Sequence, residues 1–129
     1  MTSEYSSRSM DYEETVWEQL YKHLKEKGFE VYAPGEKLGD CERPYLVVMI
    51  DTGAKHINYS TDQDYYTILC YVPYSQYSKL ERLILSVKEA MADLKPILKS
   101  NGYRSPSFAD DTIKAHMVSL QYYNYKKQL

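Results

Sequence analysis

Imidazole side chains combine metal binding with proton transfer near neutral pH, and this sequence contains three of them. They are His23, His56 and His116, and no two follow the HxxxH or HExxH spacing of paired zinc ligands. Because a zinc site needs several such ligands together, the spacing predicts no zinc centre. We interpret His23 as lying on a helix flank, His56 in a loop and His116 on a strand, each as an ordinary polar side chain.

Two aspartate pairs, Asp62 with Asp64 and Asp110 with Asp111, could offer oxygens to a divalent cation. Neither pair is followed by the other ligands and the glycine of a calcium loop, and turns are rich in Asp for conformational reasons. No GxGxxG, P-loop or GxSxG motif is present. The sequence therefore predicts no metal, no cofactor and no enzymatic activity. One alternative stays open, a small enzyme or ligand-binding α+β domain with His116, Asp110 and Asp111 near a pocket.

Length and composition predict one domain over residues 1–129, with a flexible arm at 1–10 and a polar tail at 124–129. Sixteen basic and eighteen acidic residues are nearly balanced, so we expect no nucleic-acid partner and no polybasic membrane surface. No apolar run approaches the ~20 residues of a membrane span, and the start of the chain does not resemble a signal peptide. Two cysteines without a CxxC motif fit a reducing cytoplasm.

Tyrosine is the unusual residue of this composition, with fifteen copies against two phenylalanines. Its apolar ring and polar hydroxyl suit a surface that a partner later buries. Tyrosine also has a high strand propensity, so it could simply fill strands. Composition alone leaves both interpretations open.

The clearest structural signal is a strand followed by a helix over residues 65–98. The apolar run 65–72 ends at Pro73, and Ser78 with Glu81 has the spacing of a capping box for a helix over 78–95 or 78–98. Apolar residues then recur at three- and four-residue steps: Leu80, Leu83, Ile84, Val87, Met91, Leu94 and Leu98. We expect Leu83 and Val87 in the core, Pro96 to close or kink the helix, and Asn101-Gly102 to provide a left-handed stop.

An earlier helix is predicted from acidic residues at 11–14 to Gly28, with Trp17 as its anchor on a sheet. Its apolar stripe is Val16, Trp17, Leu20, Tyr21 and Leu24. Residues 29–32 form a short strand and 33–43 a loop. The strand 45–50 is apolar on both faces, which predicts helices on one side and a second layer or a neighbouring subunit on the other. Residues 54–64 form a projecting hairpin.

The remaining chain is predicted as a turn-rich connection over 99–112 and a last strand over 113–123. A strand, a helix and a strand in succession make this last strand parallel to 65–72 if the two are neighbours. The fold class is therefore α+β. We expect a single-layer mixed sheet of about four strands with two helices on one face, in the order helix, three strands, helix, strand.

Three features together resemble one protein family: the helix-first order, residues 64–73 (DYYTILCYVP) ahead of a Ser-x-Leu-Glu helix, and residues 105–119 (SPSFADDTIKAHMVS). The chain resembles the small tail-terminator or head–tail joining (tail completion) proteins of tailed phages and of Gram-positive prophages, from about residue 11 to 125. The resemblance implies a non-enzymatic virion protein in the tail or neck, assembled in the bacterial host cytoplasm. It also implies a homo-oligomeric, usually hexameric, ring that caps the tail tube protein and meets the head–tail connector protein.

No catalytic residues accompany that resemblance. In such a ring each subunit needs two different adhesive patches, because heterologous contacts close by rotation. Segments that interleave tyrosine with polar residues beside apolar strands are our candidates for these contacts. The candidate interface residues are Lys55, His56, Tyr59, Asp62, Tyr74, Tyr77, Tyr122, Tyr123, Tyr125 and Lys126.

Overall fold

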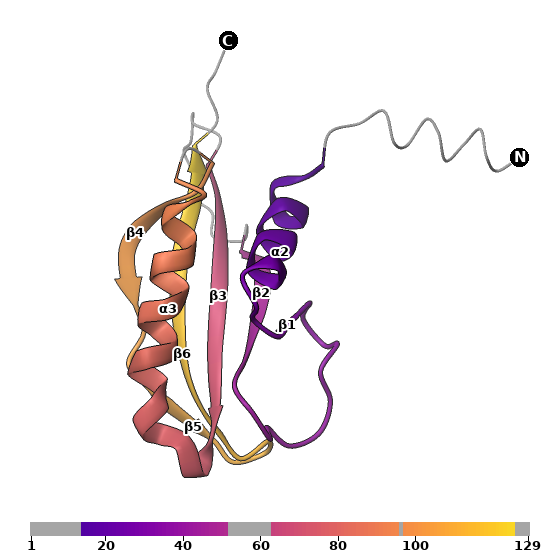
Figure 1. Ribbon diagram of the computed structural model, residues 1–129, viewed down its shortest axis with the longest axis vertical. Helices are drawn as coiled ribbons and strands as arrows, with labels where there is room; N and C mark the ends of the chain where they lie inside the picture. Colours follow the sequence, from indigo (N-terminus) through magenta and orange to yellow (C-terminus); the bar gives the residue numbers. More distant parts are fainter. Residues whose placement is uncertain (1–13, 52–62, 96, 126–129) are drawn as a thin grey trace, which may run out of the picture.

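The computed structural model describes residues 14–51, 63–95 and 97–125, which form two helices on one face of a six-stranded sheet (Figure 1). The sheet has the order β1-β2-β3-β6-β4, with β5 also paired to β6, and only β1 and β2 run parallel. The strands are β1 Val31–Tyr32, β2 Tyr45–Asp51, β3 Gln63–Pro73, β4 Lys99–Arg104, β5 Phe108–Asp110 and β6 Ala115–Tyr125. The α+β class with a mixed sheet is confirmed.

The helix α2, Val16–Glu26, begins with a capping box in which Thr15 and Glu18 satisfy each other's backbone N–H groups. It ends before Gly28, whose φ of 98° suits a residue without a side chain. The indole N–H of Trp17 donates to the carbonyl oxygen of Val48 in β2 at 2.9 Å. Trp17 therefore anchors the helix on the sheet, as predicted.

The helix α3, Leu80–Ala92, begins and ends differently from its prediction. A 3₁₀ helix, η1 (Tyr74–Lys79), leads into it, so the N–H of Leu80 donates to the carbonyl of Tyr77 and no side chain caps the helix. The capping box predicted at Ser78 is wrong, because the 3₁₀ turn already satisfies the orphan donor. The helix also ends at Ala92, three residues before Lys95, because proline at position 96 disfavours helical backbone before it.

The stretch 99–112 contains two strands where we predicted a connection without strands. All six residues of β4 are exposed, and β4 is an edge strand whose pairing with β6 is irregular between Ser100 and Arg104. An edge strand with water on both sides needs no apolar alternation, so its sequence carries no periodic signal. Gly102, with φ of 83°, lies in this irregularity and does not terminate a helix.

The last strand, β6, runs antiparallel to β3, with Ile68 opposite Leu120, so the predicted parallel arrangement is wrong. The chain leaves α3 into β4, which is antiparallel to β6 and hence parallel to β3. The strand–helix–strand crossover therefore joins β3 to β4, and β6 is inserted between them. Because β4 was not predicted from the sequence, the crossover was assigned to β6, which is the wrong strand.

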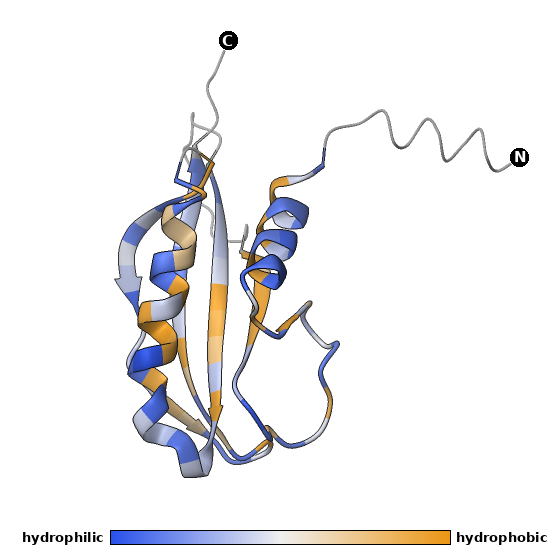
Figure 2. Ribbon diagram, viewed as in Figure 1, coloured by the Kyte–Doolittle hydropathy of each residue, from blue (hydrophilic) through white to orange (hydrophobic). Residues whose placement is uncertain are grey.

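The main core lies between the sheet and the two helices, where apolar side chains of β2, β3 and β6 meet those of α2 and α3 (Figure 2). Val87 is fully buried there, whereas Leu83 is only partly buried. A ring nitrogen of His23 donates to the carbonyl oxygen of Ala90 at 2.8 Å and links the two helices. His23 is therefore on a helix flank, as predicted, with a structural partner.

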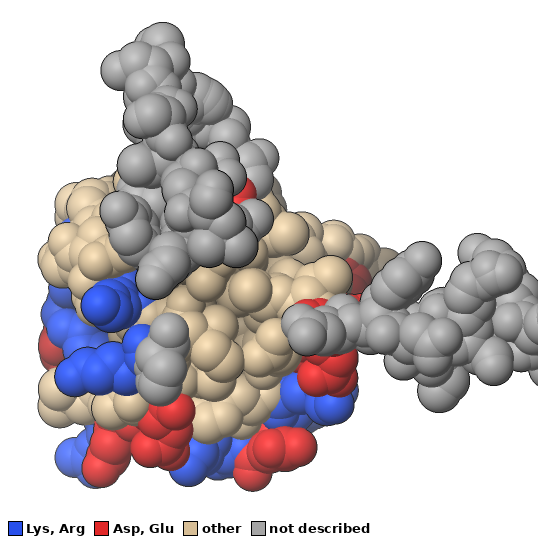
Figure 3. Space-filling model, turned by 90° about the horizontal axis from the view of Figure 1, so that it is seen from above, with Lys and Arg blue, Asp and Glu red and all other residues tan. Residues whose placement is uncertain are grey.

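Seen from above, several Lys and Arg side chains lie on the side of α3 and β4, with Asp and Glu side chains among them (Figure 3). No described helix is long and apolar enough to cross a membrane.

Candidate assembly surfaces

The face of the sheet opposite the helices carries a second, smaller apolar cluster. Strand alternation puts Tyr45 and Val47 of β2 on this face, opposite Tyr71 and Leu69 of β3. The Tyr45 and Tyr71 rings stack with centroids 4.9 Å apart. The second apolar face predicted for this central strand is therefore present.

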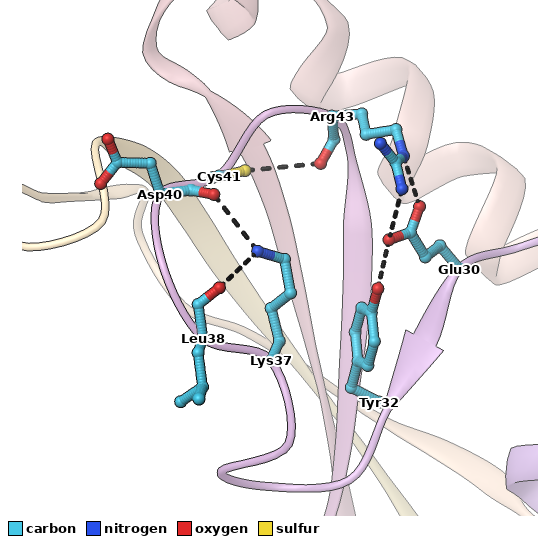
Figure 4. Close-up of polar contacts among 7 residues, drawn as sticks. All are labelled: Glu30, Tyr32, Lys37, Leu38, Asp40, Cys41 and Arg43. Atoms are coloured by element: carbon cyan, nitrogen blue, oxygen red, sulfur yellow. Dashed lines mark hydrogen bonds and ion pairs between the residues drawn. The ribbon is translucent and has the colours of Figure 1, made fainter.

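The loop between β1 and β2 covers one part of this open face (Figure 4). Its Lys37 ammonium donates to the carbonyl oxygens of Leu38 and Asp40 at 2.9 and 3.2 Å, and lies 5.4 Å from the Tyr45 ring centre. The N–H of Cys41 donates to the carbonyl of Ile113 at 2.8 Å. These contacts hold the loop against the lower half of the sheet and supply part of the predicted second layer.

An ion pair secures the base of that loop. The Arg43 guanidinium donates to Glu30 at 2.8 Å, and the Tyr32 hydroxyl donates to the same carboxylate. These hydrogen bonds, the one from Tyr32 first and the one from Arg43 second, lower the pKa of Glu30. The Glu30 carboxylate therefore stays ionised as a fixed acceptor for both partners.

The other part of the open face has no cover among the described residues. Met49 of β2, Thr67 of β3 and Gln121 of β6 lie side by side in register across it, and each is half-buried. Ser119 and Tyr123 continue the same face of β6 and are also partly exposed. This row mixes methyl groups, a thioether and short polar groups, the composition of a surface that a protein partner can cover.

A second candidate surface is aromatic and lies where β3 ends. Tyr74, Tyr77 and Phe108 are 37%, 54% and 49% exposed. His116 of β6 lies against the two tyrosines, with ring centroids 5.2 and 4.7 Å away. Exposed aromatic side chains gathered at one end are typical of contact surfaces, so Tyr74 and Tyr77 remain candidates for assembly.

The alternative of a small enzyme rested on His116, Asp110 and Asp111, and two of these residues lie together at the aromatic end. The Tyr74 hydroxyl donates to Asp111, and this hydrogen bond, more than any other cause, raises the pKa of Tyr74 to about 12. Asp110 instead accepts from the backbone and hydroxyl of Thr112, as turn aspartates do. Asp111 and His116 thus share Tyr74 as a neighbour, while Asp110 has a local structural partner.

The other candidate residues fall in three places. Lys55, His56, Tyr59, Asp62 and Lys126 lie outside the described residues, as does most of the predicted 54–64 hairpin. Tyr125 is placed by its backbone, at the end of β6. Tyr122 is 5% exposed in the main core, whereas Tyr123 lies on the open face.

Sequence reasoning missed a third surface, a groove of about 590 Å³ between the end of α3 and the strands β4 and β6. Lys88, Lys95 and Lys99 line it, and no sequence pattern groups them because they come from a helix, a turn and an edge strand. Within the described part of the chain, no group of three or more His, Cys, Asp or Glu side chains could hold a metal ion.

Comparisons with known proteins add no functional assignment. No family model and no curated protein matches the chain. One solved structure, of a protein whose name states no function, aligns with 88% of this chain and 89% of its own at 12% identity, with a TM-score of 0.41. At that TM-score the similarity supports no conclusion about fold or function.

Proposed function

We propose that this protein is a non-enzymatic structural subunit of a phage or prophage virion. In this proposal it is a tail terminator whose ring, a hexamer, caps the tail tube and joins it to the head connector in the neck of the particle. The open sheet face supports assembly of the protein from copies of itself. The tail-tube and connector partners rest on the sequence resemblance alone.

The observation that supports self-assembly is the half-covered sheet face. Both helices pack on one side, so the row Met49, Thr67 and Gln121 on the other side has no second layer among the described residues. Another chain that packs there would remove apolar area on that face from water, which stabilises a contact by roughly 25 cal/mol per Å². A ring subunit needs such a surface in addition to its own core.

The test is a charge placed in the middle of that row. We expect the purified wild-type protein to sediment as a hexamer and to form rings in electron micrographs. Thr67→Arg should reduce it to monomers, because a guanidinium would be buried without a partner in the contact. Unfolding of the monomer by urea should change by less than about 0.5 kcal/mol, since Thr67 is half-buried.

Ser86→Arg is the matched control, because Ser86 is an exposed residue of α3, on the side of the sheet opposite the Met49, Thr67 and Gln121 row. It should assemble like the wild type and cap tubes made from the cognate tail-tube protein, whereas Thr67→Arg should leave those tubes uncapped. A wild-type protein that stays monomeric at every concentration, alone and with tubes, would contradict the proposal.

A further inference from the structure

The lysine groove has the features of a site for an acidic peptide. Its volume of about 590 Å³ lies within the ~300–1,000 Å³ of ordinary ligand sites. Its apolar lining includes Met91, Leu98 and the ring of Tyr122, and Lys88, Lys95 and Lys99 stand around it. An apolar floor with a basic rim suits a segment that combines carboxylates with an aromatic side chain.

Several basic side chains near the helices have a carboxylate partner, and the three groove lysines have none among the described residues. Lys22 pairs with Glu14, Lys27 with Asp93 and Arg104 with Glu81, all within the described residues. No such pair within 4.0 Å involves Lys88, Lys95 or Lys99 in that part of the chain. Three like charges around one groove repel each other, so an anionic partner would relieve that repulsion.

The chain itself contains a complementary segment. Asp11, Tyr12 and Glu13 immediately precede Glu14, which is the first described residue before α2. Two carboxylates flank one tyrosine, which matches lysines around an apolar floor in both charge and shape. We propose that the groove binds the segment Asp11–Glu13 of a second copy. This inference rests on the proposed self-assembly and specifies one of its contacts.

The positions of the two partners favour a neighbouring copy over the same chain. Glu14 is held 2.6 Å from Lys22 on α2, and α2 packs against β1 and β2. The groove extends from β6 to the β4 edge, and its Lys99 lies on β4, three strand spacings of about 4.8 Å from β2. Three residues reach at most about 11 Å from Glu14. Glu14, which follows the donor segment, therefore lies toward the opposite edge of the sheet from Lys99, the arrangement of a head-to-tail contact that can close into a ring.

Charge reversal on each side tests the contact in the full-length protein. The groove variant carries Lys88→Glu, Lys95→Glu and Lys99→Glu, and the segment variant carries Asp11→Lys and Glu13→Lys. Each alone should self-associate at least about tenfold more weakly than the wild type in sedimentation at 0.1 M salt. Mixing the two should restore association, because each reversed groove then meets a reversed segment on the other variant. Docking within one chain would leave the mixture dissociated, and this result would overturn the proposal.

A control variant separates a local contact from a change in net charge. Lys25→Glu, Lys79→Glu and Arg82→Glu make the same charge change as the groove variant at exposed positions outside the groove. This variant should associate like the wild type. Equal loss of association in the control and groove variants would overturn the proposal.

A binding measurement distinguishes failure of this inference from failure of the proposed function. A fluorescent peptide with the sequence of residues 9–15 should bind the segment variant, whose groove is intact, and should bind the groove variant at least about tenfold more weakly. Peptide binding without wild-type self-association would retain the groove as a peptide site and refute assembly as the function. Assembly without peptide binding would retain the proposed function and overturn the groove contact. Equal competition by a single-stranded DNA oligonucleotide would show a general anion surface and would also overturn it.

Discussion

Ile68 and Leu69 are neighbours in β3, yet their side chains occupy different environments. Ile68 points into the helix-covered core and is fully buried, whereas Leu69 points to the opposite face and is only partly buried. The first face is complete within one subunit. The second is covered in part by the 33–43 loop and is otherwise open among the described residues. A sheet of this kind contributes to folding through one side and can offer the other to a partner.

Truncation of these two neighbours should measure that difference. Ile68→Ala is expected to lower the free energy of unfolding by about 2–5 kcal/mol, because it leaves a cavity in packed surroundings. Leu69→Ala should cost less than half as much in the monomer, since part of its surface already contacts water. Urea unfolding at low protein concentration checks both. Equal losses would show that the loop completes the second face as fully as the helices complete the first.

A substitution at Trp17 measures how much the contact between α2 and the covered face stabilises the fold. Trp17→Phe keeps an aromatic ring on the sheet but removes the N–H that donates to the Val48 carbonyl. We expect a loss of about 1–3 kcal/mol, the cost of leaving a partly buried acceptor unsatisfied. Tyr21→Phe is the control, because it retains the ring that stacks on Trp17 at 4.9 Å. If both variants lose the same stability, the indole hydrogen bond is not what anchors α2.

Substitution of Tyr122 or Tyr74 should have the smallest effect on stability at neutral pH. In alkali it should change how stability depends on pH. Burial raises the pKa of Tyr122 to about 12, whereas for Tyr74 the first cause of a similar rise is its hydrogen bond to Asp111. A tyrosine whose pKa is raised above its ordinary value of 10.0 stabilises the fold fully below pH 10, and that contribution is lost as pH rises toward 12. Wild-type stability should therefore fall across this window.

Replacing each tyrosine by phenylalanine shows how much of this loss of stability each one causes. Tyr122→Phe should remove part of the alkaline fall, because one buried phenolate is no longer formed, while Tyr45, Tyr66 and Tyr71, whose pKa values burial also raises, still contribute. Tyr74→Phe should change the fall less, since Tyr74 is exposed. Stability curves between pH 9 and 12 provide the measurement. Equal flattening by both substitutions would show that burial on the covered face is not the dominant cause.

The sequence predicted the exposed tyrosines of the aromatic end, whereas it did not predict the lysine groove. Tyr74 and Tyr77 were predicted as contact residues because they alternate with polar residues beside an apolar strand, and both are exposed. Tyr122 looked equivalent in composition but lies in the core. Strand alternation puts Tyr122 on the apolar face of Val118 and Leu120 and Tyr123 on the polar face of Ser119 and Gln121, so alternation, and not composition, separates the two.

The sequence by itself determined the elements that have a periodic apolar face: α2 with its Trp17 anchor, the strands β2 and β3, and the apolar stripe of α3. Periodicity is a property of the local sequence, so it can be recognised without knowing which elements pack against each other. The tertiary structure alone decided the strands β4 and β5, the antiparallel direction of β6 and the convergence of Lys88, Lys95 and Lys99. An exposed edge strand has no periodic signal, and side chains from a helix, a turn and a strand come together only when the chain folds back on itself.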